Sequence, residues 1–218
     1  WVLYSTHTGT VHLHDYEIGV ELFCFNVTTN NKPVRCVAFH PTQPLFACGT
    51  DDFDVVVYNW QRKIKLFTLT GHTDYVRSVE FHSKFPLLIS SSDDSTARIW
   101  NWQSRCCVAI LEEHTYFVMS ARFNPEKPLI ATASLDDCVR VFNVNALFNS
   151  SMSTDVDASF ISMDDTAILS SELEEHPEGA TCVAWDKTGN RLISCGEDSE
   201  IKIYLVVNDE ASLMTTIP

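Results

Sequence analysis

The sequence predicts an all-β protein built from repeated units of four short strands, and three observations carry this prediction. Residues of the same chemical type recur every 42 positions over much of the chain. The segments between them are short and either apolar or alternately apolar and polar, as strands are. Finally, 45% of the 218 residues are hydrophobic, which is enough apolar material to bury a core. A disordered chain is therefore not expected.

The 42-residue period is seen at several kinds of position. The residues that share this spacing are His72 and His114, Trp60 and Trp102, Val34, Val76 and Val118, and Asp52, Asp94 and Asp136. After Asp136 the next match is Asp198, which lies 62 positions on. His114 and His176 are separated by the same distance. The shared excess predicts one insertion, at about 146–171, whose Ser- and Asp-rich composition is typical of a surface loop.

One unit shows the four strands in order. Residues 76–81 alternate between two faces, and residues 86–91 form a short apolar run that suits a strand buried on both faces. A turn at 93–95 leads to a third strand at 96–100, and a fourth follows at 108–111. Such units, repeated at a period of about 40–45 residues, are typical of the blades of a β-propeller. We expect a single partial propeller domain over 1–218 with five blades, at about 1–27, 33–70, 75–112, 117–170 and 179–218, the first without its inner strand.

The third unit carries a motif. Gly71-His72, Asp94 and Trp100 resemble the Gly-His and Trp-Asp signature of WD40 repeats. This resemblance implies a buried hydrogen-bond chain through four side chains, namely His72, Ser90, Asp94 and Trp100. A buried imidazole or carboxylate persists only when it is paired, so we expect these residues to be structural rather than catalytic or metal-binding. The equivalent residues of other units, for which we expect the same role, are His114, His176, Asp52, Asp136 and Asp198.

WD40 propellers usually close with seven blades. Five blades at this period therefore predict an incomplete or degenerate ring whose remaining blades lie outside this sequence, which also lacks an initiating Met. An open ring leaves strand edges unpaired, and unpaired edges favour aggregation.

The composition limits the classes of partner. The net charge is −14, with 29 acidic and 15 basic residues, and nucleic acid is not an expected partner because its binding requires Lys and Arg to neutralise phosphates. The acidic surplus favours basic partners such as Lys-rich peptides, or it only keeps the surface soluble. Eight cysteines without a Cys-x-x-Cys pair fit a reducing compartment. No apolar run approaches the ~18 residues of a membrane span.

Several connecting segments resemble the amino-terminal propellers of coatomer alpha subunits, which belong to the coat of Golgi-to-ER and intra-Golgi transport vesicles. These segments are residues 39–44, 69–77, 92–105 and 117–123. The string Trp100-Asn101-Trp102-Gln103-Ser104-Arg105 is the most diagnostic, and it favours the alpha over the beta-prime coatomer subunit. The resemblance is close over about 33–144, looser at 1–27 and 176–205, and absent from the insertion.

The resemblance implies that the propeller binds the carboxy-terminal dilysine retrieval signals of membrane cargo. The residues implied to contact the peptide are Arg35 and His7 for its carboxylate, Asp51, Asp74 and Asp93 for its lysine side chains, and Phe117 as an aromatic neighbour. The residues also allow a plainer alternative, because Arg35 recurs as Arg77 one period later. In that alternative Arg35 only braces its strand, and Asp51 and Asp93 are only solvated turn residues.

The resemblance further implies other coatomer subunits as partners. It also implies a cytoplasmic location and peripheral association with Golgi membranes and coated vesicles through the coat. No catalysis, cofactor or metal is expected, because the sequence lacks a Gly-rich phosphate loop, a Gly-x-Ser-x-Gly elbow and a His-Glu-x-x-His helix. The alternative function is that of a generic WD40 interaction scaffold, such as a receptor that presents substrates to a ligase.

Overall fold

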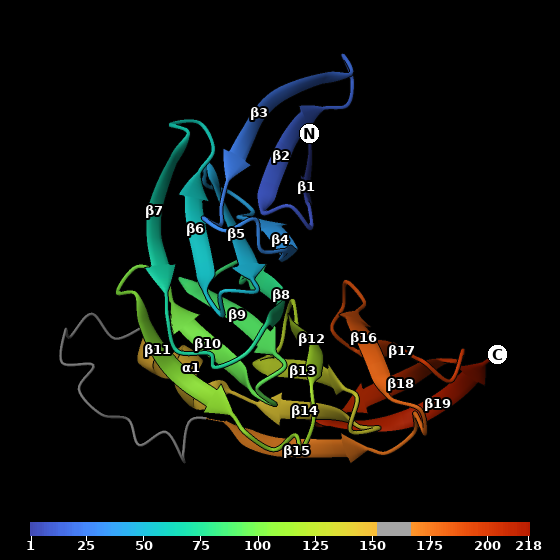
Figure 1. Cartoon of the computed structure of the whole chain (residues 1–218). Coiled ribbons are helices and arrows are strands. Elements are labelled where there is room, and N and C mark those ends of the chain that lie inside the picture. Colours follow the sequence, from blue (N-terminus) through green and yellow to red (C-terminus); the bar gives the residue numbers. More distant parts are fainter. Residues whose placement is uncertain (152–166) are drawn as a thin grey trace.

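The computed structural model describes residues 1–151 and 167–218, and it confirms the predicted fold class. The described residues form one three-stranded and four four-stranded sheets, in each of which the paired strands are antiparallel and follow one another in sequence. Figure 1 shows the five sheets arranged round an open arc, with the first sheet (blue) at one end and the last (red) at the other. The molecule is thus a partial β-propeller.

The strands of each blade have the following bounds. The first blade contains β1 (Val2–Ser5), β2 (Thr10–Asp15) and β3 (Val20–Asn26). The second contains β4 (Val34–Phe39), β5 (Leu45–Thr50), β6 (Val55–Asn59) and β7 (Ile64–Leu69), and the third contains β8 (Val76–Phe81), β9 (Leu87–Ser92), β10 (Ala97–Asn101) and β11 (Cys106–Leu111). The fourth contains β12 (Val118–Phe123), β13 (Leu129–Ser134), β14 (Val139–Asn143) and β15 (Ile168–Leu173), and the fifth contains β16 (Ala180–Trp185), β17 (Arg191–Gly196), β18 (Ile201–Val207) and β19 (Glu210–Ile217).

The expected insertion differs from a plain loop at both of its ends. Its first residues belong to helix α1 (Asn145–Ser151), and strand β15 already begins at Ile168. The helix is held by apolar contacts, because Leu147 is buried among side chains of the third and fourth blades and Phe148 stacks on Phe85 with ring centroids 4.6 Å apart. The boundaries of about 146–171 were therefore too wide, and the remainder of the expected loop, 152–166, lies outside the described residues.

Neighbouring blades are held together by apolar clusters between their faces. The first strands of the four complete sheets, β4, β8, β12 and β16, contact one another in turn on the inner side of the arc (Figure 1). Four separate buried clusters each join side chains of two successive blades. Strand β9 contributes to two of them, since Leu88 packs toward the second blade while Leu87 and Ile89 pack toward the fourth. Each middle blade is therefore buried on both faces, which explains why every residue of its second strand is buried.

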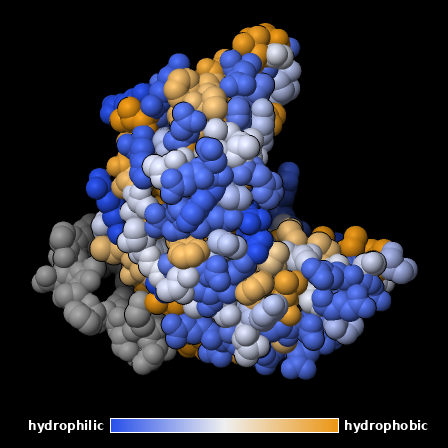
Figure 2. All heavy atoms as spheres, in the orientation of Figure 1, coloured by the Kyte–Doolittle hydropathy of each residue, from blue (hydrophilic) through white to orange (hydrophobic). Residues whose placement is uncertain are grey.

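The two end blades are packed on one face only. In β17, Leu192 is buried whereas Ile193 is exposed, and in β2 the buried Val11 and Leu13 alternate with partly exposed residues. Large apolar side chains are consequently exposed at both ends of the arc, including Tyr16 and Ile18 in the first blade and Met214 in the last. Figure 2 shows apolar surface at both of these ends.

A hydrogen-bond chain crosses the third blade from its leading loop to its third strand. The His72 ring contacts Asp94 through Nδ1 and Ser90 through Nε2, each at 2.7 Å, and Trp100 Nε1 donates to the same Ser90 hydroxyl at 2.8 Å. Burial alone would raise the pKa of Asp94, but hydrogen bonds from His72, Thr96 and the backbone N–H of Thr73 outweigh it and hold that pKa well below its usual range. These are the four side chains that the WD40 motif singles out.

The other blades vary this arrangement. In the fourth, His114 contacts Asp136 at 2.9 Å and Thr132 at 2.7 Å. In the fifth, the corresponding contacts of His176 are with Asp198 at 2.8 Å and Ser194 at 2.6 Å. The second blade differs from the expectation for Asp52, because Asn30 stands where the other blades have histidine and Asp52 pairs with Lys32 at 2.7 Å instead.

We predict that Ser90→Ala lowers the free energy of unfolding by about 1–3 kcal/mol, because both His72 Nε2 and Trp100 Nε1 lose their partner inside the protein. Cys48→Ala is the matched control, since Cys48 occupies the same place in the second blade and its thiol contacts only the Val56 carbonyl. Urea unfolding of both variants measures the difference. Equal losses would show that the hydrogen-bond chain adds nothing to the packing.

His82 gives the fold a pH dependence. Its Nδ1 accepts the backbone N–H groups of Lys84 and Phe85 at 3.0 and 3.1 Å. Burial, followed by the charge of Lys84, lowers the pKa of His82 to about 4. In the fourth blade Asn124 closes the equivalent turn through its side-chain oxygen.

We predict that acidification from pH 6.5 toward 4 destabilises the protein, because unfolded His82 takes up a proton that the folded state excludes. The loss is at most about 1.4 kcal/mol for each pH unit. His82→Asn keeps the turn and removes this titration, so its stability falls less between pH 7 and pH 5 in urea unfolding. Identical slopes for wild type and His82→Asn would contradict the assignment.

Candidate functional site

The inner strands of the four complete blades each contain a bulge at the same place. The pairing of β8 with β9 skips Arg77, and the pairing of β4 with β5 skips Arg35. The equivalent residues of β12 and β16 are Met119 and Thr181. A bulge leaves one residue out of the ladder and re-aims its side chain. Each complete blade therefore has one side chain at the start of its inner strand that lies outside the strand pairing.

A second row of side chains lies beside the first. In each complete blade, the residue that follows the second strand donates its backbone N–H to the carbonyl of the residue that precedes the inner strand. Asp93 donates in this way to Tyr75, and Leu135 to Phe117, each at 3.0 Å. We use the term rim for the surface that three sets of residues form: these turn residues, the bulge residues, and the residues that precede the inner strands. Its turn residues are Asp51, Asp93, Leu135 and Glu197, and the residues that precede the inner strands are Pro33, Tyr75, Phe117 and Gly179.

Two ion pairs occupy the rim of the second and third blades. Arg35 donates through Nε and Nη2 to the two oxygens of Asp51, each at 2.7 Å. Arg77 forms the same two-point pair with Asp93, with Nε to Oδ1 at 2.6 Å. The acid side chains are only 7% and 3% exposed, so each carboxylate is buried and fully engaged by its arginine.

These pairs change the roles expected for Asp51 and Asp93. Neither acid faces solvent as a free carboxylate, because its own blade supplies a guanidinium to both of its oxygens. Nor are they merely solvated turn residues, since they are buried. Arg35 does brace its blade, yet about a quarter of its side chain remains exposed. The acids therefore act by fixing the arginines, and the arginines are the part of the pair that reaches the surface.

Tyr75 lies close to both arginines. Its ring centroid is 5.4 Å from the Cζ atom of Arg35 and 6.0 Å from that of Arg77. The Tyr75 residue is 37% exposed, and Nη1 of both arginines makes no hydrogen bond within the described residues. The rim thus presents one aromatic ring flanked by two guanidinium groups with free donors. The sequence analysis missed Tyr75, although it precedes an inner strand just as Phe117 does.

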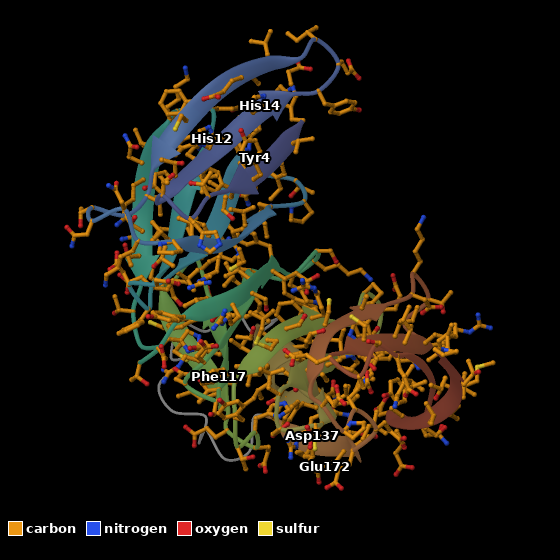
Figure 3. The ribbon with its side chains drawn as sticks, turned by 45° about the vertical axis from the view of Figure 1, so that its right-hand side comes forward. Tyr4, His12, His14, Phe117, Asp137 and Glu172 are labelled. Carbon is orange, nitrogen blue, oxygen red and sulfur yellow. The ribbon has the colours of Figure 1, made fainter. Side chains whose placement is uncertain are left out.

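The remaining expected peptide-binding residues lie around this centre. Asp74 is partly exposed, and one of its oxygens accepts the Tyr75 N–H at 2.8 Å. Phe117, labelled in Figure 3, stacks on the exposed Tyr116 with ring centroids 4.2 Å apart in the next blade. His7 is exposed in a turn whose Thr6 carbonyl accepts the Val34 N–H at 3.0 Å, next to Arg35. The structure therefore brings Arg35 and Asp74 to one patch with Tyr75, while Phe117 and His7 lie on its two sides.

The rim offers arginines and aromatic rings rather than metal ligands or a nucleophile. Within residues 1–151 and 167–218, groups of three potential metal ligands occur elsewhere, at His12, His14 and Glu21 and at Cys138, Glu172 and Glu174. All eight cysteines are free thiols, and burial raises the pKa of the Cys36 thiol to about 12. Among the described residues no helix has the length and apolar character needed to cross a bilayer.

Comparison with known proteins identifies the repeat. The family model described as "WD domain, G-beta repeat" matches four segments that together cover more than half of the chain, namely residues 22–59, 63–101, 105–143 and 167–204. The matched segments each run from the outer strand of one blade to the third strand of the next. No curated protein matches the chain significantly.

The two ion pairs yield a stability prediction. Arg77→Met leaves the Asp93 carboxylate buried without its partner and should lower the free energy of unfolding by about 3–5 kcal/mol. The double variant Arg77→Met/Asp93→Leu reproduces the pair Met119 and Leu135 that the fourth blade carries at these positions, and it should recover most of the loss. Urea unfolding measures both. A double variant as unstable as the single one would refute the pairing as the cause.

Proposed function

Because the chain belongs to the WD40 repeat family, we propose that it is a peptide-binding propeller of the coatomer alpha type, which takes carboxy-terminal dilysine tails of membrane cargo on its rim. Propellers of this family are typically interaction scaffolds rather than enzymes. In this proposal the chain works in the cytoplasm with other coatomer subunits, on the Golgi membranes where the coat assembles.

The observation that carries the proposal is the Tyr75 patch, in which two guanidinium groups with free Nη1 donors flank one exposed ring. A terminal carboxylate is an anion that a guanidinium N–H binds well, so it suits this patch. The buried partners Asp51 and Asp93 hold the arginines in place, so little side-chain entropy is lost when a peptide binds. Arg77 joins Arg35 in this role, which the sequence analysis gave to Arg35 and His7.

The lysine side chains of the tail need exposed acids, and Asp74 supplies one next to the patch. One Asp74 oxygen is held by a backbone N–H, which fixes the carboxylate and leaves its second oxygen for an ammonium group. The net charge of −14 raises the local concentration of a basic peptide around the whole molecule. Phe117 and Tyr116 extend the apolar surface along which the residues after the lysines would lie.

The test is binding of a fluorescein-labelled peptide that ends in Lys-Lys-Ala-Ala with a free carboxylate, measured by fluorescence polarisation. We predict that amidation of its carboxyl terminus, or Tyr75→Ala in the protein, weakens binding at least tenfold, which corresponds to about 1.4 kcal/mol. Asp74→Asn should reduce the preference for Lys-Lys over Ser-Ser at the same peptide positions. Tyr16→Ala is the matched control, because Tyr16 is exposed in the first blade, away from the rim.

Two outcomes separate the proposal from its alternatives. Equal binding of the Lys-Lys and Ser-Ser peptides would exclude dilysine recognition and leave a generic interaction scaffold, for instance a ligase substrate receptor. Loss of binding in Tyr16→Ala as well as in Tyr75→Ala would place the peptide outside the rim. Neither readout distinguishes the alpha from the beta-prime coatomer subunit, for which the sequence 100–105 remains the argument.

A further inference from the structure

The first blade turns one face outward, and this face is polar at its centre. Val11 and Leu13 point the other way and are buried against the second blade. The alternation of β2 therefore directs His12 and His14 to the outward face. Strand pairing sets Glu21 of β3 opposite His14.

Tyr4 of β1 is opposite His12 in the same sheet. Figure 3 shows the labelled side chains of Tyr4, His12 and His14 together on this sheet, well away from the rim residue Phe117.

The carboxylate of Glu21 lies between the two imidazole rings. Its Oε1 is 3.3 Å from Nδ1 of His12, and its Oε2 is 3.4 Å from Nε2 of His14. One ligand atom from each of the three residues can be chosen so that all lie within 4.8 Å of one another. Nitrogen and oxygen ligands about 2.0–2.1 Å from a tetrahedral zinc ion are themselves about 3.3–3.4 Å apart. Each of these two contacts has the length of such an edge, one on each oxygen of Glu21, so an ion that takes a single Glu21 oxygen draws the second imidazole slightly closer.

The surroundings of His12 favour a metal ligand over an ordinary hydrogen-bonded histidine. Its Nδ1 atom is buried and has no hydrogen-bond partner. Its Nε2 atom is 2.9 Å from the Thr10 hydroxyl, which is in turn bonded to the Thr6 hydroxyl at 2.7 Å. When Nε2–H donates to the Thr10 hydroxyl, the Nδ1 lone pair faces the Glu21 carboxylate. A cation between the lone pair and the carboxylate stabilises this arrangement. Metal-binding histidines typically donate their second N–H to such an outer partner.

We propose that His12, His14 and Glu21 bind a divalent transition-metal ion of the zinc class. Two imidazoles and one carboxylate are a donor set that Zn²⁺ accepts, and three protein ligands leave a fourth position for water or for a group from a partner. In this chain the side chains of His12, His14 and Glu21 are 20%, 31% and 42% exposed.

Tyr4 supports the site without being needed as a ligand. Its ring is stacked on that of His12 with centroids 5.0 Å apart, and its hydroxyl is 3.2 Å from Nε2 of His14. On metal binding, this nitrogen exchanges its contact with the Tyr4 hydroxyl for the ion. The second ligand group, Cys138, Glu172 and Glu174, differs in that Glu172 is already paired with the buried Arg140.

The experiment measures Zn²⁺ binding to the full 218-residue chain, first stripped with a chelator, by competition with a chromophoric chelator. We expect one site that is weakened at least tenfold in Glu21→Gln and in His14→Gln. Glu174→Gln, in the second ligand group, is the matched control and should bind as wild type does. Co²⁺ in the same site should give the strong visible absorption of a four-coordinate ion, and Glu21→Gln should abolish it.

Two results would overturn the proposal. One is a wild-type chain that binds no stoichiometric Zn²⁺, in which case the three side chains form only a polar cluster on this sheet. The other is Zn²⁺ binding that Glu21→Gln leaves unchanged. Glu21 is exposed, so its variant is expected to fold, and circular dichroism checks this. If His14→Gln unfolds, Glu21→Gln alone decides, and peptide binding at the rim does not enter the result.

Discussion

The whole structure depends on burial of apolar side chains between neighbouring blades. A fully buried Leu or Ile side chain contributes about 1.5–3 kcal/mol, whereas one intramolecular hydrogen bond contributes about 0.5–1.5 kcal/mol net. The second blade illustrates which of the two dominates. It has Asn30 and Cys48 in place of the histidine and serine of the third blade, yet it forms the same four strands between two apolar clusters. Apolar packing therefore determines the blades, and the buried hydrogen-bond chains attach the connecting loops to them.

Because packing fixes the blades, the rim can vary from blade to blade. The bulge and the following turn present an arginine and an aspartate in the second and third blades, and Met119 with Leu135 in the fourth. The same backbone thus displays a charged, aromatic patch on one side and an apolar one beside it. Asp51 and Asp93 are buried beneath Arg35 and Arg77, and each carboxylate holds its arginine in place. The rim of this acidic chain therefore still presents two arginine side chains at its surface.

The ends of the arc follow a different rule, because each end blade is packed on one face. The outer face of the first blade carries the polar groups His12, His14 and Glu21, which are partly exposed in this chain. In the last blade the free face carries exposed apolar side chains such as Ile193 and Leu205 instead. The two ends are thus chemically distinct surfaces.

The sequence by itself determined the repeat, the four strands of each blade and the buried motif of His72, because spacing and alternation along the chain encode which face a residue occupies. It also marked Arg35 and Asp51 as rim residues. Only the tertiary structure decided that these two pair with each other, that Tyr75 lies close to both arginines, and that helix α1 packs on the third and fourth blades. Each of these depends on contacts between residues far apart in sequence, at a bulge or between blades, and a periodic pattern does not specify such distances.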